Sequence, residues 1–291
     1  MITHPQLSSL LTAGPLTQGS DGIYSIPIPP SASDQDAERA LRERVAAQQY
    51  DNYLATIAFN HSIPVMSHEV DRFLASMPHG ALILDVGGCW GWHWRRLAKS
   101  RPDVGVLIID FVRASLIHAE KVLGSLVGTQ VALMHADATA LPFTDAGADF
   151  PGFDGVWSVQ TFQHIPDFSQ ACHEAHRVLK TGGRLENYSL HVTPLVQSIY
   201  RLFGRPYHKE GMVKDLFHLA RANDRQQAAL AEIFGGPVEN RYTECLFHPD
   251  LMLTFTGRKG SWMGQLDAHL GDFPALGRWL ARQRSFGVVK S

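Results

Sequence analysis

Residues 81–91 read ALILDVGGCWG, and this stretch decides the class of fold. The first seven residues form a short apolar run, which is typical of a strand buried in a parallel sheet. Gly87, Gly88 and Gly91 then predict a tight turn, and the helical segment WHWRRLAKS follows it. A buried strand, a glycine turn and a helix in this order predict the first unit of an α/β fold.

The same alternation continues along the chain. Four further apolar runs are separated by stretches with helical spacing, and they cover residues 104–110, 131–136, 153–159 and 183–190. We therefore predict a doubly wound, mostly parallel sheet with helices on both faces. The helix of residues 168–180 is expected to end at Thr181-Gly182-Gly183, because glycine readily supplies the positive φ of a helix C-terminus.

The segments on either side of this alternation are predicted to form an arm and an insert. Residues 1–34 are rich in Ser, Pro, Gly and Thr and are expected to be irregular, with a helix after them over residues 34–63. A second helix over residues 67–77 is expected to be capped by Ser67. The alternation then stops, and residues 192–235 look mostly helical.

The composition suits one large domain. The 291 residues, 45% of them hydrophobic and 19% charged, can bury a full core. We divide the chain into an N-terminal arm and helix, residues 1–64, which could act as a lid, and a main domain, residues 65–291, which contains the insert. The net charge of −2 gives no overall attraction to DNA.

Membrane, metal and disulfide chemistry are not expected. The sequence holds no run of about 18 apolar residues that could span a membrane. Its cysteines, Cys89, Cys172 and Cys245, lie far apart and form no CxxC pair, so neither a zinc site nor a disulfide framework is predicted. This cysteine usage fits a cytoplasmic protein.

The chemistry is expected at the carboxyl ends of the strands, where ligands bind in a parallel sheet. The glycine turn does not match the dinucleotide fingerprint GxGxxG, because Cys89 and Trp92 stand where glycines are required. A ligand without phosphates needs only a close approach of the backbone at Gly87 and Gly91. Asp85 can order that turn or meet a cationic amine.

Two further aspartates close the next strands. Asp110 comes 25 positions after Asp85 and suits a hydrogen bond to both hydroxyls of a ribose. The alternative is an ordinary capping aspartate before the helix that begins near Val112. Asp137 is an acceptor where an adenine amino group would lie, and the alternative there is a turn aspartate.

The segments ILDVGGCWG, LIID, HADATALPF, FDGVWSVQTFQHIPD and RVLKTGGRL resemble, in order and spacing over residues 65–190, the motif set of class I S-adenosylmethionine-dependent methyltransferases. The resemblance implies a seven-stranded sheet whose last strand is antiparallel, formed here by residues 239–246 and 285–289. It implies S-adenosylmethionine as the cofactor. One departure is that the family usually has glycine where Cys89 stands.

The resemblance also implies where the cofactor binds. Asp110 would hold the ribose, Asp137 with Ala138 would meet the adenine, and the turn after the first strand would surround the methionine part. The backbone at Ser158 and Val159 would receive the amino acid end. The full set of implied cofactor-binding residues is Asp85, Gly87, Gly88, Gly91, Asp110, Phe111, Asp137, Ala138, Ser158 and Val159.

The predicted function is therefore methyl transfer to a small-molecule acceptor, with the methylated atom undetermined. A base is needed only if the acceptor must lose a proton, and histidine is suited to that near neutral pH. His164, after the fourth strand, and His191, past the fifth, are the candidates. His93 could reach the cofactor carboxylate, although a surface position is favoured for it.

Other functions remain open to different degrees. A DNA amino-methyltransferase should show an Asn/Asp/Ser-Pro-Pro-aromatic tetrad after the fourth strand, and SVQTF stands there instead. An RNA or protein methyltransferase stays open because its acceptor contacts could lie in the insert. A protein of this fold that binds the cofactor without transferring methyl also stays open. The insert could wall the acceptor pocket or form a homodimer surface.

Overall fold

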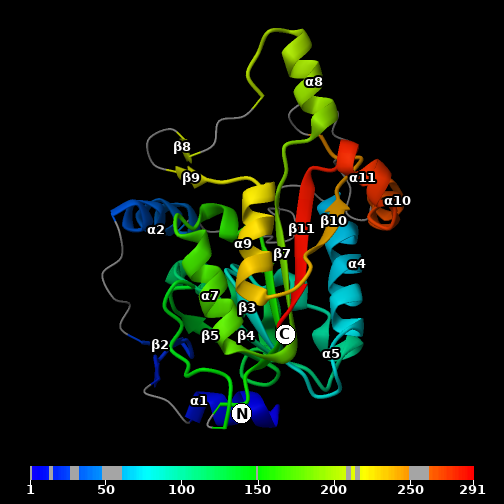
Figure 1. Cartoon of the computed structure of the whole chain (residues 1–291). Helices are drawn as coiled ribbons and strands as arrows, with labels where there is room; N and C mark the ends of the chain where they lie inside the picture. The colour runs from blue at the N-terminus through cyan, green and yellow to red at the C-terminus, as the bar shows by residue number, and fades with distance from the viewer. Residues whose placement is uncertain are drawn as a thin grey trace.

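A nine-stranded sheet forms the centre of the molecule (Figure 1). The computed structural model describes residues 2–12, 16–26, 33–47, 61–148, 150–207, 211–213, 217–248 and 262–291. The strands of the sheet are β1 (Thr17–Gln18), β2 (Tyr24–Ser25), β3 (Leu82–Val86), β4 (Gly105–Asp110), β5 (Val131–His135), β6 (Phe153–Val159), β7 (Leu179–Leu190), β10 (Glu239–Thr243) and β11 (Gln283–Val289).

The order of the strands is β1-β2-β5-β4-β3-β6-β7-β11-β10. The pairings between successive strands from β2 to β7 are parallel, whereas β1 pairs antiparallel with β2, and β11 pairs antiparallel with both β7 and β10. These pairings confirm the mostly parallel sheet and its antiparallel last strand. All seven predicted strands are present, and β1 and β2 extend the sheet at one edge.

The helices complete a layered α/β structure. They are α1 (Pro5–Thr12), α2 (Ser33–Ala46), α4 (Ser62–Ala75), α5 (Leu97–Ser100), α6 (Arg113–Leu123), α7 (Phe168–Val178), α8 (Pro194–Leu202), α9 (Asp224–Phe234), α10 (Trp262–Leu270) and α11 (Pro274–Leu280). Short 3₁₀ turns are η1 (Trp92–Trp94), η2 (Gly124–Leu126) and η3 (Phe162–His164), and a separate hairpin joins β8 (Gly211–Val213) to β9 (Phe217–Leu219).

Alternate residues of β3 divide the core into two layers. Leu82 and Leu84 pack in one buried cluster with residues of α1, α7 and α9. Ile83 packs in a second cluster with residues of α4 and α6. Because successive side chains of a strand point to opposite faces, the two clusters lie on the two sides of the sheet. The prediction of helices on both faces is therefore confirmed.

Three predicted boundaries around the sheet are wrong. Residues 1–34 are not irregular throughout, because β2 pairs with the otherwise free edge of β5 and α1 packs into the core. Helix α4 begins at Ser62 rather than at Ser67, since Pro64 lies in its first turn, where proline removes no helical hydrogen bond. The segment WHWRRLAKS forms only η1 and the short helix α5.

The glycines after α7 do not cap that helix. Helix α7 ends at Val178, and residues 179–190 are all β7, so Thr181-Gly182-Gly183 lies inside a strand. Gly182 has a φ of +79°. The pairing between β6 and β7 shifts register there, which is the irregularity that a glycine in a strand permits.

The insert of residues 192–235 is only partly helical. Helices α8 and α9 are present, but the hairpin of β8 and β9 lies between them. The sequence did not predict this hairpin, because strands of three residues are too short to show a periodicity. Helix α9 begins with a capping box at Asn223 and ends at Gly235, whose φ is +70°. Helix α8 stands away from the sheet at the top of Figure 1.

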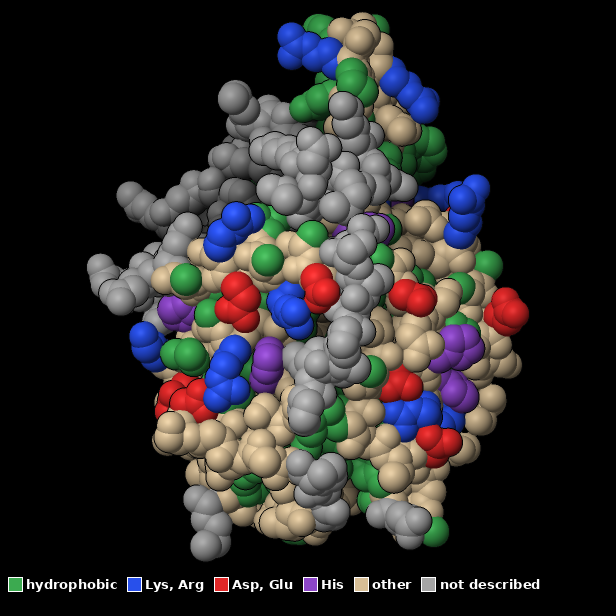
Figure 2. Space-filling view, turned by 90° about the vertical axis from the view of Figure 1, so that its left-hand side faces the viewer, with side chains coloured by type: hydrophobic (Ala, Val, Ile, Leu, Met, Phe, Trp, Pro, Cys, Tyr) green, Lys and Arg blue, Asp and Glu red, His purple; other side chains and the backbone are tan. Residues whose placement is uncertain are grey.

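Charged side chains of both signs are interspersed over the face shown in Figure 2. The described residues on that face therefore form no continuous basic surface of the kind that a nucleic-acid backbone attracts. None of the helices in the described ranges has the length and apolar character needed to cross a bilayer.

A buried aspartate supports the turn after β3. Asp85 is 1% exposed, and its Oδ2 accepts a hydrogen bond of 2.6 Å from the indole Nε1 of Trp94, which is fully buried in the same layer. Burial is the main cause that raises the pKa of Asp85 to about 7; the Trp94 hydrogen bond opposes this rise, and the nearby charge of Asp110 adds to it. Asp85 thus keeps a proton that an exposed aspartate would release.

This raised pKa predicts a pH dependence of stability. Between about pH 4 and pH 7 the folded protein binds a proton at Asp85 that the unfolded chain has lost, so the free energy of unfolding should fall as the pH rises. Asp85→Asn keeps the shape of the protonated carboxyl. We expect its free energy of unfolding to fall less over this pH range than that of the wild type. Urea unfolding at pH 4.5, 5.5 and 7 measures the difference.

A second aspartate gives the control for this experiment. Asp103 has a pKa lowered mainly by its hydrogen bonds from Arg101, so its contribution to the free energy of unfolding is lost only as the pH falls below about 4. In Asp103→Asn the free energy of unfolding should therefore change between pH 4.5 and pH 7 as it does in the wild type. Identical slopes for the wild type and Asp85→Asn would contradict the prediction.

Candidate functional site

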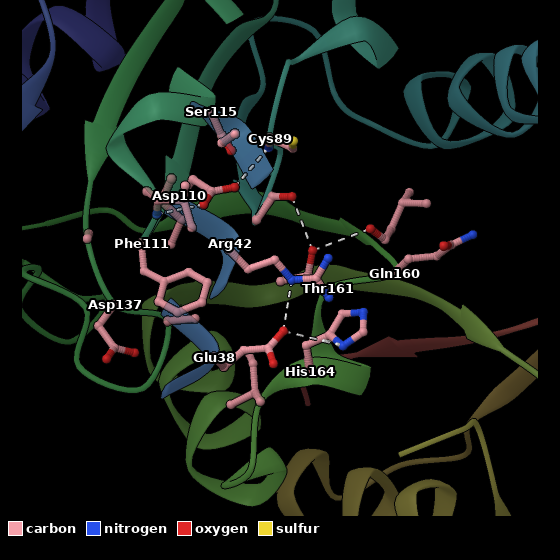
Figure 3. A pocket seen from close by; sticks show the side chains of 18 of the residues that line it. Glu38, Arg42, Cys89, Asp110, Phe111, Ser115, Asp137, Gln160, Thr161 and His164 are labelled. Carbon is pink, nitrogen blue, oxygen red and sulfur yellow. Dashed lines mark hydrogen bonds and ion pairs between the residues drawn. The ribbon is translucent and has the colours of Figure 1, made fainter. Parts of the chain in front are cut away.

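A cavity of about 280 Å³ lies at the carboxyl ends of β3, β4, β5 and β6. Its floor comes from the loops that follow these strands, and α2 contributes Glu38 and Arg42 from the other side (Figure 3). The ends of parallel strands are where the sheet was expected to bind its ligand. We call this space the first cavity.

Asp110 lies in the first cavity at the end of β4. Its Oδ2 accepts a hydrogen bond of 3.1 Å from the backbone N–H of Cys89, and its Oδ1 accepts one of 2.9 Å from that of Val112. Burial raises the pKa of Asp110 to about 6, although these two N–H groups counteract the rise. Asp110 therefore caps the turn before α6, as the alternative reading expected, and also faces the cavity with a carboxylate.

The glycine turn comes close to the loop after β6. Gly87 has a φ of +68°, and a Cβ atom there would lie 2.1 Å from the side chain of Thr161, so only glycine fits. The hydroxyl of Thr161 donates to the carbonyl of Gly87 at 3.1 Å (Figure 3). Cys89 has a φ of +49°, which explains why a glycine would be easier at this position.

The lining of the first cavity fits a nucleoside without phosphates. Phe111, Val112 and Ala138 supply apolar surface beside the Asp110 carboxylate. Among the described lining residues only Arg42 carries a permanent positive charge, and its Nε lies 2.8 Å from Oε1 of Glu38. A phosphate would need more positive charge than this, whereas a carboxylate beside an apolar slot suits ribose hydroxyls and a base.

Most of the predicted cofactor residues meet in one place. Gly87, Asp110, Phe111, Asp137, Ala138 and Val159 line the first cavity. Asp85, Gly91 and Ser158 do not line the first cavity. Asp85 instead holds Trp94, and the hydroxyl of Ser158 donates to the carbonyl of Val86 at 2.9 Å.

Asp137 forms a turn. Its Oδ1 accepts hydrogen bonds of 2.8 Å from both the backbone N–H and the hydroxyl of Thr139. The interpretation of Asp137 as a turn aspartate is therefore correct for Oδ1. Asp137 also lines the first cavity, so this role is compatible with a contact to the base of a bound nucleoside.

The two candidate histidines lie apart. His164 lines the first cavity, where its Nδ1 donates to the carbonyl of His218 at 2.8 Å and lies 3.8 Å from Oε1 of Glu38 (Figure 3). His191 lines a different cavity with Tyr242 and Arg284. Burial lowers the pKa of His164 to about 3 and that of His191 to about 4, so both rings are neutral near pH 7.

Several residues of the first cavity had no signal in the sequence. Glu38 and Arg42 lie four positions apart on α2, a spacing that usually marks an exposed ion pair on a helix. Gln160 and Thr161 follow β6 without any motif of their own. Only the position of α2 against the strand ends brings these residues to the site.

A second cavity of about 310 Å³ adjoins the first. Both cavities are lined by the same five residues, which are Gly87, Cys89, Trp90, Val159 and Gln160. Gly88 and His93 line the second cavity, and the expected surface position of His93 is wrong, because the residue is only 9% exposed. The described residues of the insert before Tyr207, which were expected to wall a pocket, line neither of the two cavities.

The sequence has curated relatives among small-molecule methyltransferases. A family model for the methyltransferase domain matches residues 84–186. The chain is 33% identical to the 27-O-demethylrifamycin SV methyltransferase of Amycolatopsis mediterranei, over 40% of this chain and 41% of that one. It is 31% identical to the demethylmenaquinone methyltransferase of Thermus thermophilus, over 48% of this chain and 60% of that one. The chain thus spans less than two thirds of the length of these relatives.

Solved structures share the fold at low identity. A SAM-dependent methyltransferase of Thermotoga maritima matches with a TM-score of 0.53 and 13% identity, over 89% of this chain and all of the other. The [4+2]-cyclase SpnF matches with a TM-score of 0.50 and 16% identity, over 90% and 98% of the two chains. Because one neighbour is named a cyclase, the fold alone does not fix the reaction.

The matched segment spans β3 to β7, the sheet is mostly parallel with an antiparallel last strand, and a cavity that contains Asp110 lies at the strand ends. The segment from residue 84 to residue 186 therefore matches a methyltransferase domain, as the resemblance of its motifs to class I S-adenosylmethionine-dependent methyltransferases implied.

Proposed function

We propose that this protein transfers a methyl group from S-adenosylmethionine to a small molecule. The observation that carries the proposal is the position of Asp110 in a cavity without phosphate-binding charge, directly beside a second cavity that could hold an acceptor. The names of the relatives, which act on a rifamycin and on a menaquinone precursor, support a small-molecule acceptor.

The residues of the first cavity would hold the cofactor. Asp110 accepts hydrogen bonds from the ribose hydroxyls, and Phe111 and Ala138 pack beside the base with Asp137 at its edge. Gly87 and Val159 leave room for the amino acid end. Asp85, Gly88, Gly91 and Ser158 support the turn and strand ends around it. When bound, S-adenosylmethionine supplies a methyl group on a positively charged sulfur, which is already an activated donor.

The protein's own contribution is chiefly to bring two molecules together. Holding reactants in line is worth about 7–11 kcal/mol in favourable cases. A general base is needed only for an acceptor that must lose a proton. His164 and His191 remain our candidates for that role. His164 is preferred because it lines the first cavity, which adjoins the second, whereas His191 lines neither of the two.

We propose a cytoplasmic location, because the three cysteines are unpaired. Within residues 1–64, helix α2 acts as a lid, which is supported by Glu38 and Arg42 lining the first cavity. A homodimer is supported by apolar side chains exposed at the ends of α8, α10 and α11, including Phe203 at 72% and Trp262 at 73%, and sedimentation velocity would measure it.

Two other functions have some support. An RNA or protein methyltransferase would use the same cofactor cavity, and binding that weakens steeply with salt would favour RNA. A protein that binds the cofactor for another reaction is supported by the cyclase neighbour. Mass spectrometry of a metabolite pool incubated with the protein and isotopically labelled cofactor separates these functions, because only methyl transfer to a small molecule labels a metabolite.

Asp110→Ala should weaken binding of S-adenosylhomocysteine. Loss of a charge-assisted pair of hydrogen bonds to the ribose corresponds to about 1–3 kcal/mol, or roughly a fivefold to 150-fold rise in Kd. Isothermal titration calorimetry measures the effect. The control is Asp145→Ala, an exposed aspartate outside the first cavity that should leave the Kd unchanged. Equal affinity of Asp110→Ala and wild type would remove Asp110 from the site.

His164→Ala should lower turnover of the labelled metabolite and leave the affinity for S-adenosylhomocysteine unchanged, because the ring lies against Glu38 and His218 rather than beside Asp110. The matched substitution is His191→Ala at the histidine outside the first cavity, which should have a smaller effect on turnover. Wild-type turnover in both variants would leave the reaction without a histidine base.

A further inference from the structure

The second cavity has a polar end formed by the last two strands of the sheet. Glu244 directly follows β10, and Arg282 directly precedes β11, so the two residues continue the antiparallel register by one pair. The guanidinium of Arg282 donates to Oε2 of Glu244 at 2.5 Å, and its backbone N–H donates to the carbonyl of Glu244 at 3.1 Å. Gln283 lines the cavity beside them.

Residues that line this end of the cavity carry hydrogen-bond acceptors that nothing in the described chain satisfies. Glu244 is fully buried, and its Oε1 has no partner among the described residues. The Oε1 of Gln283, which is 1% exposed, also has none. Both ring nitrogens of His93 likewise have no hydrogen-bond partner among the described residues. Buried polar groups are normally hydrogen-bonded, so unmet acceptors around one cavity point to a ligand that donates to them.

Backbone strain concentrates at the same place. In the described ranges, three residues other than glycine have a positive φ: Cys89 at +49°, Gln160 at +55° and Glu244 at +59°. All three line the second cavity. Strained residues of this kind persist where the surrounding structure holds them for binding or catalysis. The strain and the unmet acceptors are independent observations of one cavity.

The charges around the cavity favour an uncharged ligand. From the last strands come Glu244 and Arg282, which neutralise each other. From the glycine turn comes His93, whose pKa burial lowers to about 3, and α4 contributes only Ser62 and Met66. An ammonium ion would add an unbalanced positive charge beside Arg282. A neutral hydroxyl meets Glu244 without that penalty.

The remaining walls are apolar and broad. Trp90 and Trp92 line the cavity together with Met66 and Val159. Indole side chains offer flat surfaces that pack well against flat rings. The five residues shared by both cavities, including Gly87 and Val159, are where a molecule in the second cavity would meet one in the first.

We propose that the second cavity binds the methyl acceptor, and that the acceptor is a flat, uncharged molecule with a hydroxyl group that donates a hydrogen bond to Oε1 of Glu244. The inference rests on the proposed function, because it assigns the first cavity to the cofactor. Glu244 anchors one hydroxyl of the acceptor, and Arg282 holds the carboxylate in place.

The test uses 2-naphthol and naphthalene as probes of the full chain saturated with S-adenosylhomocysteine. Titrations followed by ligand-observed NMR give the Kd of each probe. We expect the wild type to bind 2-naphthol about tenfold more tightly than naphthalene, as one hydrogen bond to a carboxylate requires. The ammonium probe 2-naphthylmethylamine should bind no better than naphthalene.

Glu244→Gln should abolish the preference for 2-naphthol. Arg282 needs an oxygen acceptor, so the new amide turns its NH₂ group into the cavity and the acceptor is lost. The matched control is Glu186→Gln, a buried glutamate paired with Arg184 outside the second cavity, which should keep the preference. A preference that survives Glu244→Gln would overturn the proposal.

A second variant does not disturb the buried ion pair. Ser62→Phe fills the second cavity from the first residue of α4, where the side chain is only half-buried, and should prevent binding of both probes while S-adenosylhomocysteine still binds. Undiminished 2-naphthol binding in Ser62→Phe would also overturn the proposal, and this result does not depend on the folding of Glu244→Gln.

Affinity for S-adenosylhomocysteine separates this inference from the proposed function. If Glu244→Gln weakens S-adenosylhomocysteine binding, the second cavity holds the ammonium end of the cofactor and the acceptor assignment is wrong, although the proposed function stands. If the wild type does not bind S-adenosylhomocysteine at all, the proposed function fails and the inference falls with it.

Discussion

The carboxylate of Asp110 joins the two loops on which the site depends. One oxygen accepts the N–H of Cys89 from the glycine turn, and the other accepts the N–H of Val112 from the start of α6. The carbonyl of Ile109, one residue earlier, accepts the N–H of Gly87 at 2.8 Å. These bonds fix the end of β3 against the end of β4, and the first cavity is the space that they leave in front of Asp110.

Two further contacts support the glycine turn after β3. Asp85 and Trp94 form a buried hydrogen bond beside it, and Thr161 packs against Gly87 so closely that no side chain would fit at that position. A hydrogen-bonded carboxyl of raised pKa and a strained cysteine are not what stability alone would favour. Their presence at one turn is in keeping with a loop shaped for a ligand.

The two cavities differ in the kind of group they can receive. The first combines apolar walls with a carboxylate at the end of a parallel strand, and the second has unmet acceptors at the junction of β10 and β11. The antiparallel strand β11 makes this possible, because its pairing with β10 brings Arg282 opposite Glu244 beside the carboxyl ends of the parallel strands. The last strand of the sheet therefore shapes the site as well as the fold.

Local sequence determined the parts of this protein that repeat along the chain. The apolar runs and the glycine turn predicted the strands from β3 to β7, and the acids at the strand ends predicted that Asp110 and Asp137 would lie together. Such features follow from neighbouring residues, because burial of a strand and the φ of a turn are local properties. The family resemblance then extended the prediction to β10 and β11.

Only the tertiary structure decided which distant segments complete the site. Glu38 and Arg42 look like a solvated ion pair on a helix until α2 is placed against the strand ends. Glu244 and Arg282 lie 38 positions apart and meet through strand register, and the neutral state of His93 follows from its burial. Periodicity reports which face of a segment is buried, but not what it is buried against, so long-range packing alone fixes these contacts.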